Sequence, residues 1–368
     1  MLYVTTISNT INAFLIPHIK MLVEQGHQVD VAFNKVQEVK REIVELGCKV
    51  YNIEFQRSPL SRKNISAYKQ IKSLIINQKY DLVHSHTPIA SACVRLACRK
   101  KKDIKVVYTA HGFHFYKGAP LPNWVLYYPV EKWLSKHTDI LITINKEDYA
   151  RAKASFKSKT VKYVPGVGLD IKKIQDVIIE KSAKRKDLGI PDDAFLALSV
   201  GELNKNKNHE TVIKAIAKLN DPKVYYLICG QGPLEDYLRK LILELGLNNQ
   251  VKLLGFRKDI IELCKVADIF VFPSFREGLS VALMETMACG LPVVCSDIRG
   301  NRDLIIDGQG GYLVKPDVEE EFINALQKVF SNNSLQSTFG DFNKQSMKKY
   351  GLKSVTKEMK KIYFEVKC

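Results

Sequence analysis

Short apolar segments alternate with longer amphipathic ones along this chain, and the alternation occurs in two consecutive series. The first series has runs of β-branched and aromatic residues at 2–7, 28–33, 49–53, 81–86, 105–110, 139–144 and 161–165. The second series has such runs at 194–200, 223–229, 250–255, 267–272, 291–295 and 311–314. Strands that alternate with helix-length segments form parallel sheets with helices on both faces. The sequence therefore predicts an α/β protein with two doubly wound, Rossmann-like domains.

We place the domain boundary in the segment PGVGLDIKKIQD (165–176), where Pro and Gly precede a polar, lysine-rich stretch. This gives an N-terminal domain over residues 1–170 and a C-terminal domain over residues 171–351. Apolar residues at helical spacing predict a closing helix over 352–368 that packs back toward the N-terminal domain. Ligands of such folds bind beyond the carboxyl ends of the strands, so two facing domains are expected to form a cleft.

Composition limits the compartment in which the protein is expected and the partners that it is expected to bind. The apolar runs are far shorter than the ~20 residues that span a bilayer, and no secretory segment is recognisable. The eight cysteines show neither CxxC nor zinc spacing, so we interpret them as reduced thiols of a cytosolic protein. The net charge is +17, and residues 1–170 carry most of it. This excess predicts an anionic neighbour, or alternatively a basic surface kept for solubility.

The stretch PSFREGLSVALME, which begins at Pro273, follows a buried strand and leads into an apolar helix. Its two glutamates lie about 12 Å apart along a helix axis, a span that suits one extended ligand. Ser280 is placed to cap the helix. Helix N-termini attract phosphate groups, so backbone amides at the turn predict a diphosphate site, formed by Gly278, Leu279 and Ser280. Capping or pairing of Glu285 on the protein surface is the alternative interpretation.

This stretch resembles the E-x7-E signature of the retaining family 4 glycosyltransferases, which have the GT-B fold. The resemblance continues through VGELNKNKNHETVIKAI (200–216), ICGQGPLEDYL (228–238), LLGFRKDI (253–260) and GQGGYLV (308–314). The first half, with YTAHGFHFYKGAPLPNW and LYYPVEKWLSKHTDILITIN, resembles the branch that builds bacterial exopolysaccharide and capsule repeat units. The resemblance implies a nucleotide-sugar donor bound mainly by the C-terminal domain and an acceptor bound mainly by the N-terminal domain.

The resemblance also implies roles for individual residues on the donor side. Glu277 would hold hydroxyls of the donor sugar, and Glu285 would hold the ribose. Lys207 matches a lysine that neutralises the diphosphate, but Glu202 stands where the family usually has an arginine. Lys205 or Arg276 could replace that charge. The nucleotide base would contact the turn formed by Gly255, Phe256 and Arg257.

On the acceptor side, His111 follows a predicted strand and matches a family histidine that lies near the donor sugar. With Glu277 and Lys207 it completes the implied catalytic set. Two further residues of the same segment, His114 and Lys117, are acceptor-side candidates. The first loop lacks the Gly-Gly turn common in the family, so its residues Asn9 and Thr10 are assigned to the acceptor side as well.

Together these features predict a retaining hexosyl- or N-acetylhexosaminyltransferase that uses a UDP-sugar. By resemblance, the acceptor is a saccharide linked to undecaprenyl diphosphate. The chain contains no D-x-D, so we expect neither a metal nor a cofactor. We expect the protein in the cytoplasm, peripheral to the inner face of the plasma membrane. Basic residues would hold it to anionic lipid: Arg57, Arg62, Lys63 and Lys69.

Other functions remain open at this point. A UDP-sugar epimerase of the GT-B fold would have the same two domains, although the E-x7-E stretch and the acceptor-like first half favour a transferase. An NAD-dependent dehydrogenase would need a G-x-G-x-x-G after its first strand, which LYVTTISNTIN lacks. A nucleic-acid-binding protein is suggested by charge alone, since no recognised module accompanies it.

Overall fold

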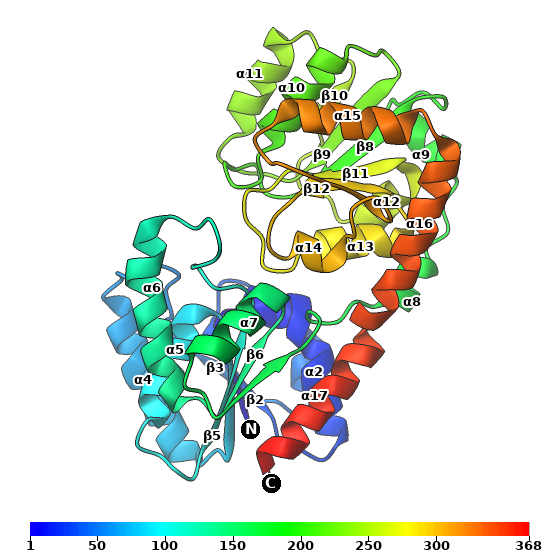
Figure 1. Cartoon of the computed structure of the whole chain (residues 1–368). Helices are drawn as coiled ribbons and strands as arrows, with labels where there is room; N and C mark the ends of the chain where they lie inside the picture. The colour runs from blue at the N-terminus through cyan, green and yellow to red at the C-terminus, as the bar shows by residue number, and fades with distance from the viewer. Residues whose placement is uncertain (368) are drawn as a thin grey trace. The chain divides into compact units, whose positions relative to one another are not determined.

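The computed structural model describes residues 1–367, and the chain divides into two compact units (Figure 1). The first unit comprises Met1–Gly168 together with the C-terminal segment that begins at Leu352. The second unit comprises Leu169–Gly351. The sequence predicted this division after residue 170.

The first unit is built on a parallel sheet of seven strands in the order β3-β2-β1-β4-β5-β6-β7. Each predicted apolar run of the first series forms one of these strands. Their bounds are β1 Leu2–Ile7, β2 Asp30–Asn34, β3 Val50–Asn52, β4 Leu82–His86, β5 Lys105–Ala110, β6 Ile140–Thr143 and β7 Thr160–Tyr163.

Helices cover both faces of this sheet because alternate strand residues point to opposite sides. In β1, Tyr3 packs with residues of α2 (Ile16–Glu24) and α17 (Leu352–Lys367), whereas Leu2 and Val4 pack with residues of α4 (Lys63–Gln78) and α5 (Pro88–Cys98). Figure 1 shows α2 and α17, which come from the two ends of the chain, side by side. The helices are α1 Ser8–Thr10, η1 Ile11–Leu15, α2 Ile16–Glu24, α3 Arg41–Glu45, α4 Lys63–Gln78, α5 Pro88–Cys98, α6 Leu121–Leu134, η2 Ser135–His137, α7 Lys146–Ser155 and α17 Leu352–Lys367.

One local prediction is wrong. Asn9 and Thr10 were expected in a loop, but they lie in α1, which begins directly after β1 and continues through the π-helical turn η1 into α2. No glycine or proline interrupts residues 8–16, so the helix starts at the strand end.

The second unit repeats the plan with six parallel strands in the order β10-β9-β8-β11-β12-β13. The strands are β8 Phe195–Val200, β9 Val224–Cys229, β10 Val251–Leu253, β11 Ile269–Phe272, β12 Val293–Ser296 and β13 Gly311–Val314. The helices are α8 Ile171–Gln175, α9 Lys181–Asp187, α10 His209–Leu219, α11 Glu235–Glu244, α12 Ile260–Val266, α13 Val281–Cys289, α14 Asn301–Leu304, α15 Glu319–Phe330, α16 Asn333–Met347 and η3 Lys348–Tyr350.

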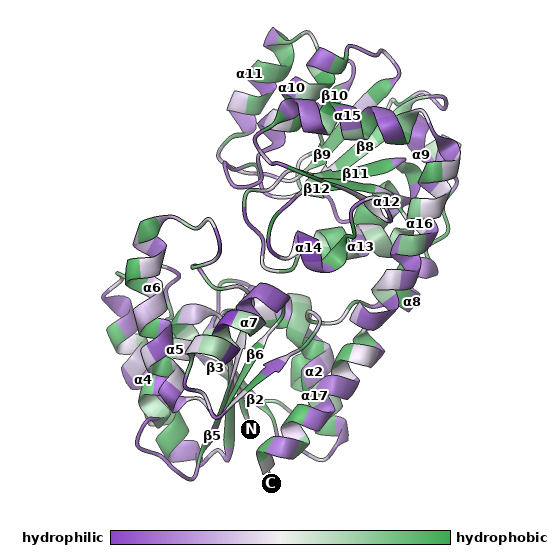
Figure 2. Ribbon diagram, in the orientation of Figure 1, coloured by the Kyte–Doolittle hydropathy of each residue, from purple (hydrophilic) through white to green (hydrophobic). Residues whose placement is uncertain are grey.

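Figure 2 shows the strands mostly in the colour of hydrophobic residues, as expected for sheets covered on both faces. The predicted closing helix is α17. It contributes Val355, Met359, Ile362 and Tyr363 to the core of the first unit. Residue 368 lies outside the described residues.

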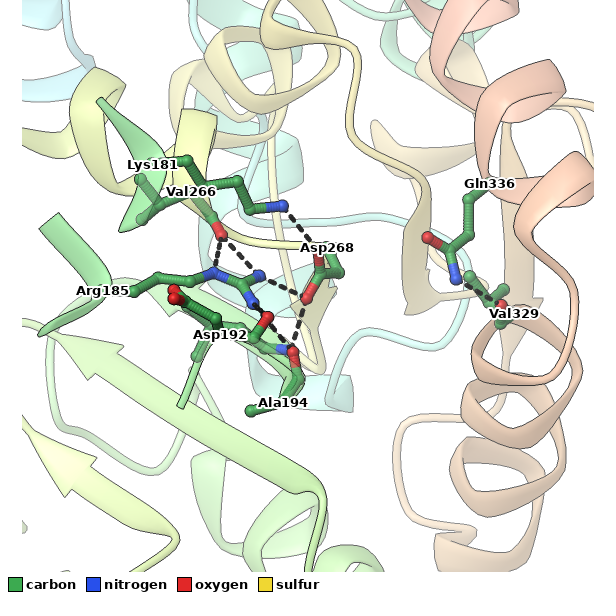
Figure 3. Close-up of polar contacts among 9 residues, drawn as sticks. Lys181, Arg185, Asp192, Ala194, Val266, Asp268, Val329 and Gln336 are labelled. Atoms are coloured by element: carbon green, nitrogen blue, oxygen red, sulfur yellow. Dashed lines mark hydrogen bonds and ion pairs between the residues drawn. The ribbon is translucent and has the colours of Figure 1, made fainter. Parts of the chain in front are cut away.

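A buried arginine ties the amino ends of two strands in the second unit together (Figure 3). The Arg185 guanidinium donates to the carbonyl oxygens of Asp192, Ala194 and Val266 and to Asp268 Oδ2, the last at 2.6 Å. Every partner comes from the ends of β8, β11 or the segments leading into them. This network holds together the edge of the sheet that lies opposite to the loops described below. Removing one partner of such a buried ion pair lowers the free energy of unfolding by about 3–5 kcal/mol.

The seven cysteines within residues 1–367 are free thiols, and all except the half-buried Cys289 are buried. Cys368, which the sequence analysis included among the reduced thiols, lies outside the described residues. Within residues 1–367, no helix has the length and apolar character needed to cross a bilayer.

Candidate active site

Two loops meet at the carboxyl edge of the second unit's sheet. One follows β8 (residues 201–208) and the other follows β11 (residues 273–280), and these strands are neighbours. The Phe275 amide donates to the Asn206 carbonyl at 2.8 Å, and the Asn206 side chain donates to the Arg276 carbonyl at 3.1 Å. Asn208, with a φ of 54°, adds a bond to the Pro273 carbonyl. The two loops therefore form one connected surface.

An ion pair lies at the centre of this surface. Lys207 Nζ is 2.7 Å from Glu277 Oε1, and the two side chains are only 20% and 14% exposed. The ammonium also lies 4.7 Å from the centre of the Phe272 ring. A Cβ at Gly201 would come within 3.0 Å of the lysine side chain, so glycine leaves room for it. Both predicted catalytic residues of this unit are thus brought into contact.

The turn after Glu277 leads into α13 as the sequence predicted. Ser280 Oγ accepts a hydrogen bond from the Leu283 amide at 3.3 Å, which confirms it as the helix cap. A second chain segment supports the turn: Arg299 donates to the Glu277 carbonyl at 3.3 Å. Next to it, Gly300 has a φ of 85°, and a Cβ there would lie 2.1 Å from the Gly278 carbonyl oxygen. This packing sets where the predicted diphosphate-binding amides of Gly278, Leu279 and Ser280 lie.

Glu285 lies on α13, about one and a half turns beyond the Ser280 cap. Its carboxylate makes no hydrogen bond or ion pair with any of residues 1–367, and burial raises the pKa of this carboxyl. A partly desolvated carboxylate without a protein donor is suited to accept hydrogen bonds from a ligand's hydroxyl groups. The surface pairing considered as the alternative for this residue is absent from the described part of the chain.

The remaining donor-side candidates are more exposed. Gly255 accepts a hydrogen bond from the Gly230 amide at 2.8 Å, which joins the loops after β10 and β9. The adjacent Phe256 is 69% exposed. Arg257 pairs with Asp259, with Nε 2.8 Å from Oδ1, and this contact holds the pKa of that carboxyl well below its ordinary value. Two loop residues, Glu202 and Lys205, are exposed to solvent.

In the first unit, histidines gather at the carboxyl ends of β4 and β5. His86 Nδ1 lies 3.0 Å from His111 Nε2, so one ring donates to the other. Burial lowers the pKa of His111 to about 4 and places the pKa of His86 well below its ordinary value. Both imidazoles are therefore neutral near pH 7, and His111 has only Nδ1 left for a ligand. His86 Nε2 is buried without a partner beside a cavity of about 20 Å³, enough for one water molecule.

A larger hollow of about 250 Å³ opens nearby at the ends of β1 and β4. Thr10, His114 and Arg57 line it together with Tyr127 of α6, whose ring stacks on His114 at 4.6 Å. Two of the four predicted acceptor-side residues thus share one hollow. The other two, Asn9 and Lys117, are exposed and are not among its lining residues.

Comparisons with known proteins connect this geometry with a family. Residues 180–346 match the family model "Glycosyl transferases group 1", and residues 3–145 match "Glycosyl transferase 4-like". EpsD of Bacillus subtilis (strain 168), named as a glycosyltransferase, is 37% identical over 98% of this chain and 95% of its own length. The chain belongs to this glycosyltransferase family.

Two further comparisons bear on the fold and the relatives of this glycosyltransferase. The UDP-Gal:alpha-D-GlcNAc-diphosphoundecaprenol alpha-1,3-galactosyltransferase of Escherichia coli is 31% identical over 75% of each chain. HepE from Anabaena, crystallised in complex with UDP, superposes with a TM-score of 0.81 over 99% of each chain at 20% identity. The predicted fold class is confirmed: each unit is a Rossmann-like domain of the GT-B class.

Three residues of these surfaces were missed or assigned elsewhere by the sequence analysis. Arg57 was assigned to lipid contact, but it lines the hollow with His114. The hydrogen bond between His86 and His111 joins residues 25 positions apart. Arg299 contacts the Glu277 backbone from the loop after β12. Each of these residues follows or ends a predicted strand. Because such positions lie at one edge of a parallel sheet, this placement could have identified them from the sequence.

Proposed function

We propose that this glycosyltransferase moves a sugar from a UDP-sugar, with retention of configuration, to a saccharide linked to undecaprenyl diphosphate. The observation that carries the proposal is the Lys207–Glu277 pair at the capped start of α13. It places a cation, a carboxylate and helix-terminal amides on one surface, as a sugar diphosphate requires. UDP is supported by the HepE complex and by the name of the galactosyltransferase relative.

In the proposed reaction the bond between the sugar's anomeric carbon and the β-phosphate oxygen breaks, and negative charge grows on that phosphate. Lys207 and the amides of Gly278, Leu279 and Ser280 would stabilise this charge, because they are fixed before the reaction begins. Glu277 would orient Lys207 and accept hydrogen bonds from sugar hydroxyls. Glu285 would accept hydrogen bonds from the ribose.

Retention would follow from attack on the face that the diphosphate leaves, with a phosphate oxygen taking the acceptor proton. No protein nucleophile is then needed, unlike in a retaining glycosidase with its closely spaced carboxylate pair. His111 would donate a hydrogen bond to the donor sugar from Nδ1. A neutral imidazole serves this role, and the lowered pKa of His111 keeps it neutral.

We propose that transfer needs no metal ion. Lys207 and the helix-terminal amides provide the positive potential that a metal would otherwise supply. Within residues 1–367, no group of three or more His, Cys, Asp or Glu side chains is arranged to hold a metal ion.

The acceptor would bind the first unit, with its diphosphate in the hollow lined by Arg57 and His114. Support comes from the galactosyltransferase relative, whose name specifies a diphosphoundecaprenol acceptor. We further propose that the enzyme works at the cytoplasmic face of the membrane in exopolysaccharide or capsule synthesis, where anionic lipid attracts its basic first half.

A ligand screen followed by a transfer assay tests the proposal. Thermal shift with UDP, GDP, ADP and dTDP should show a concentration-dependent rise in Tm that is largest for UDP. UDP release from the matching UDP-sugar should then require an acceptor diphosphate saccharide. Release of UDP or epimerised sugar without any acceptor would instead support the epimerase. Stabilisation by another nucleotide alone would disprove the assignment of UDP.

A further inference from the structure

Helix α6 of the first unit presents an apolar face to solvent. Its exposed residues are all apolar: Leu121, Pro122, Val125, Leu126, Pro129, Val130 and Trp133. Leu121 is 73% exposed, Leu126 63% and Trp133 44%. A surface helix of a globular protein normally shows the reverse pattern, with charged or polar residues on this side. Contiguous exposed apolar patches mark interaction sites.

The opposite side of α6 carries the charge that its outer face lacks. Glu131 is buried and its Oε2 pairs with Arg95 Nη2 at 2.9 Å, and that arginine side chain is 1% exposed. The Arg95 guanidinium also lies 4.4 Å from the centre of the Tyr108 ring. The helix is thus locked with its single carboxylate inward. Rotation that would bury the apolar face would leave Arg95 unpaired, at a high cost.

The helix and the segments that directly precede and follow it are basic. Within residues 117–137, Glu131 is the only acidic residue, while Lys117, Lys132 and Lys136 flank the apolar positions. A second copy placed face to face by a twofold axis would oppose the same lysines, which disfavours self-association. An anionic bilayer would bind both the apolar residues and the lysines, because lipid tails accept the apolar side chains and headgroups attract the lysines. Trp133 suits the boundary between them.

We propose that the exposed face of α6 is the membrane-contact surface of this enzyme and inserts into an anionic phospholipid leaflet. The inference rests on the proposed lipid-linked acceptor and specifies how the enzyme reaches it. The same helix supplies Tyr127, which lines the hollow with His114, and the Asn123 side chain, which donates to the His114 carbonyl at 2.9 Å. Docking of α6 would therefore place that hollow next to the headgroup layer.

Co-sedimentation with vesicles of phosphatidylglycerol and phosphatidylcholine tests this surface, with pure phosphatidylcholine vesicles as the comparison. Wild-type protein should bind the anionic vesicles, and Leu126→Glu should weaken binding at least tenfold. The matched control is Leu243→Glu on α11, since Leu243 is 64% exposed and belongs to the second unit. It should bind as the wild type does. Trp133 emission should shift to shorter wavelength on binding, and Trp133→Phe should abolish most of that shift.

A parallel assay separates this inference from the proposed function. Leu126→Glu should turn over a short-chain, water-soluble acceptor at the wild-type rate and lose activity only on acceptor embedded in vesicles. Equal vesicle binding by Leu126→Glu and wild type would overturn the inference while leaving the transferase assignment intact. A wild-type dimer in sedimentation velocity that Leu126→Glu converts to monomer would also overturn it, because α6 would then be a self-association surface.

Discussion

The carboxyl edges of the two sheets use opposite electrostatics on the same fold. In the second unit, Lys207 and Glu277 are charged and held together at 2.7 Å. In the first unit, His86 and His111 meet at 3.0 Å, and burial lowers the pKa of each, so that both are neutral. A paired charge can be redirected to a diphosphate, whereas a neutral ring pair offers hydrogen bonds without attracting phosphate. The Rossmann-like scaffold therefore leaves the chemistry to the loops after the strands.

The largest expected effect comes from breaking the charged pair. Lys207→Met and Glu277→Gln should each lower kcat/KM by about 10²–10³, because each removes a preorganised contact and leaves its partner without a counterion. The double variant should lose little more than either single variant, since the two residues act as a unit. Steady-state kinetics of UDP-sugar turnover checks this.

A control for general charge loss is available on α10. Lys214 pairs with Glu210 at 2.6 Å, but both side chains are more than a third exposed, at 38% and 34%. Lys214→Met should therefore change kcat/KM less than threefold. Fully additive losses in the Lys207 and Glu277 variants would show that the pair does not work as one site.

The next largest effect concerns the backbone that carries the charged site. Gly300→Ala should place a Cβ against the Gly278 carbonyl and cost about 2–4 kcal/mol in stability, with a roughly tenfold weaker UDP affinity. Gly308→Ala is the matched control, because Gly308 also has a positive φ of 76° but has open space around it. That variant should cost only about 1–2 kcal/mol and leave UDP affinity unchanged. Chemical denaturation and calorimetric titration measure both quantities.

Equal losses of UDP affinity in the two glycine variants would mean that the contact between Gly300 and Gly278 does not position the proposed diphosphate-binding turn. The comparison is sharp because both substitutions add one methyl group at a left-handed backbone position.

A smaller effect is expected from the neutral pair. His86→Phe should lower kcat about tenfold with little change in the KM for the donor, since His111 keeps its place but loses the partner that fixes its tautomer. The ¹⁵N shifts of the His111 ring should change from one tautomer to a mixture. His27→Gln, at the amino end of the same sheet, should change neither. Unchanged His111 shifts in His86→Phe would remove the positioning role of His86.

The same pair predicts how stability depends on pH. The pKa of His111 in the folded state is about 4, below the value of roughly 6.5 in an unfolded chain. Between these values the unfolded state binds more protons, so stability should fall as the pH falls from about 6.5 toward 4. Above pH 7, these two histidines should leave the free energy of unfolding nearly independent of pH. His86→Phe removes one such group and should flatten the slope of Tm against pH.

The contrast between the units also explains what could be predicted from the sequence. Every strand was predicted, because short apolar runs between turn residues leave no other regular structure. The turn and helix that carry Glu277, Ser280 and Glu285 were predictable as well, since these residues lie within one contiguous stretch, although the helix begins only at Val281, so helical spacing does not extend to Glu277. The contact of Glu277 with Lys207 was not predicted, because the two residues are far apart in the sequence. The histidine pair was not, because His86 and His111 meet through the register of β4 beside β5.

Surface exposure was harder still to predict. The sequence LPNWVLYYPVEKW has the composition of a buried helix, and the inward pairing of Glu131 with Arg95 fixes which of its apolar residues face outward. Arg57 likewise carries no local pattern that distinguishes a hollow from an open surface. In both instances the deciding contact comes from a residue distant in the sequence.

The smallest expected effect concerns metal ions, and it tests whether the charged site is sufficient. If Lys207 and the amides after Glu277 stabilise the leaving diphosphate, excess EDTA should change kcat by less than twofold. The Lys207→Met variant tests whether a metal ion can replace the lysine's charge. If its residual activity is also insensitive to EDTA but rises when Mg²⁺ or Mn²⁺ is added, the ion replaces the missing ammonium, and the protein's own charge performs that role in the wild type. Complete loss of wild-type activity in EDTA, restored by either ion, would contradict metal-independent transfer and reassign Lys207 to orienting Glu277.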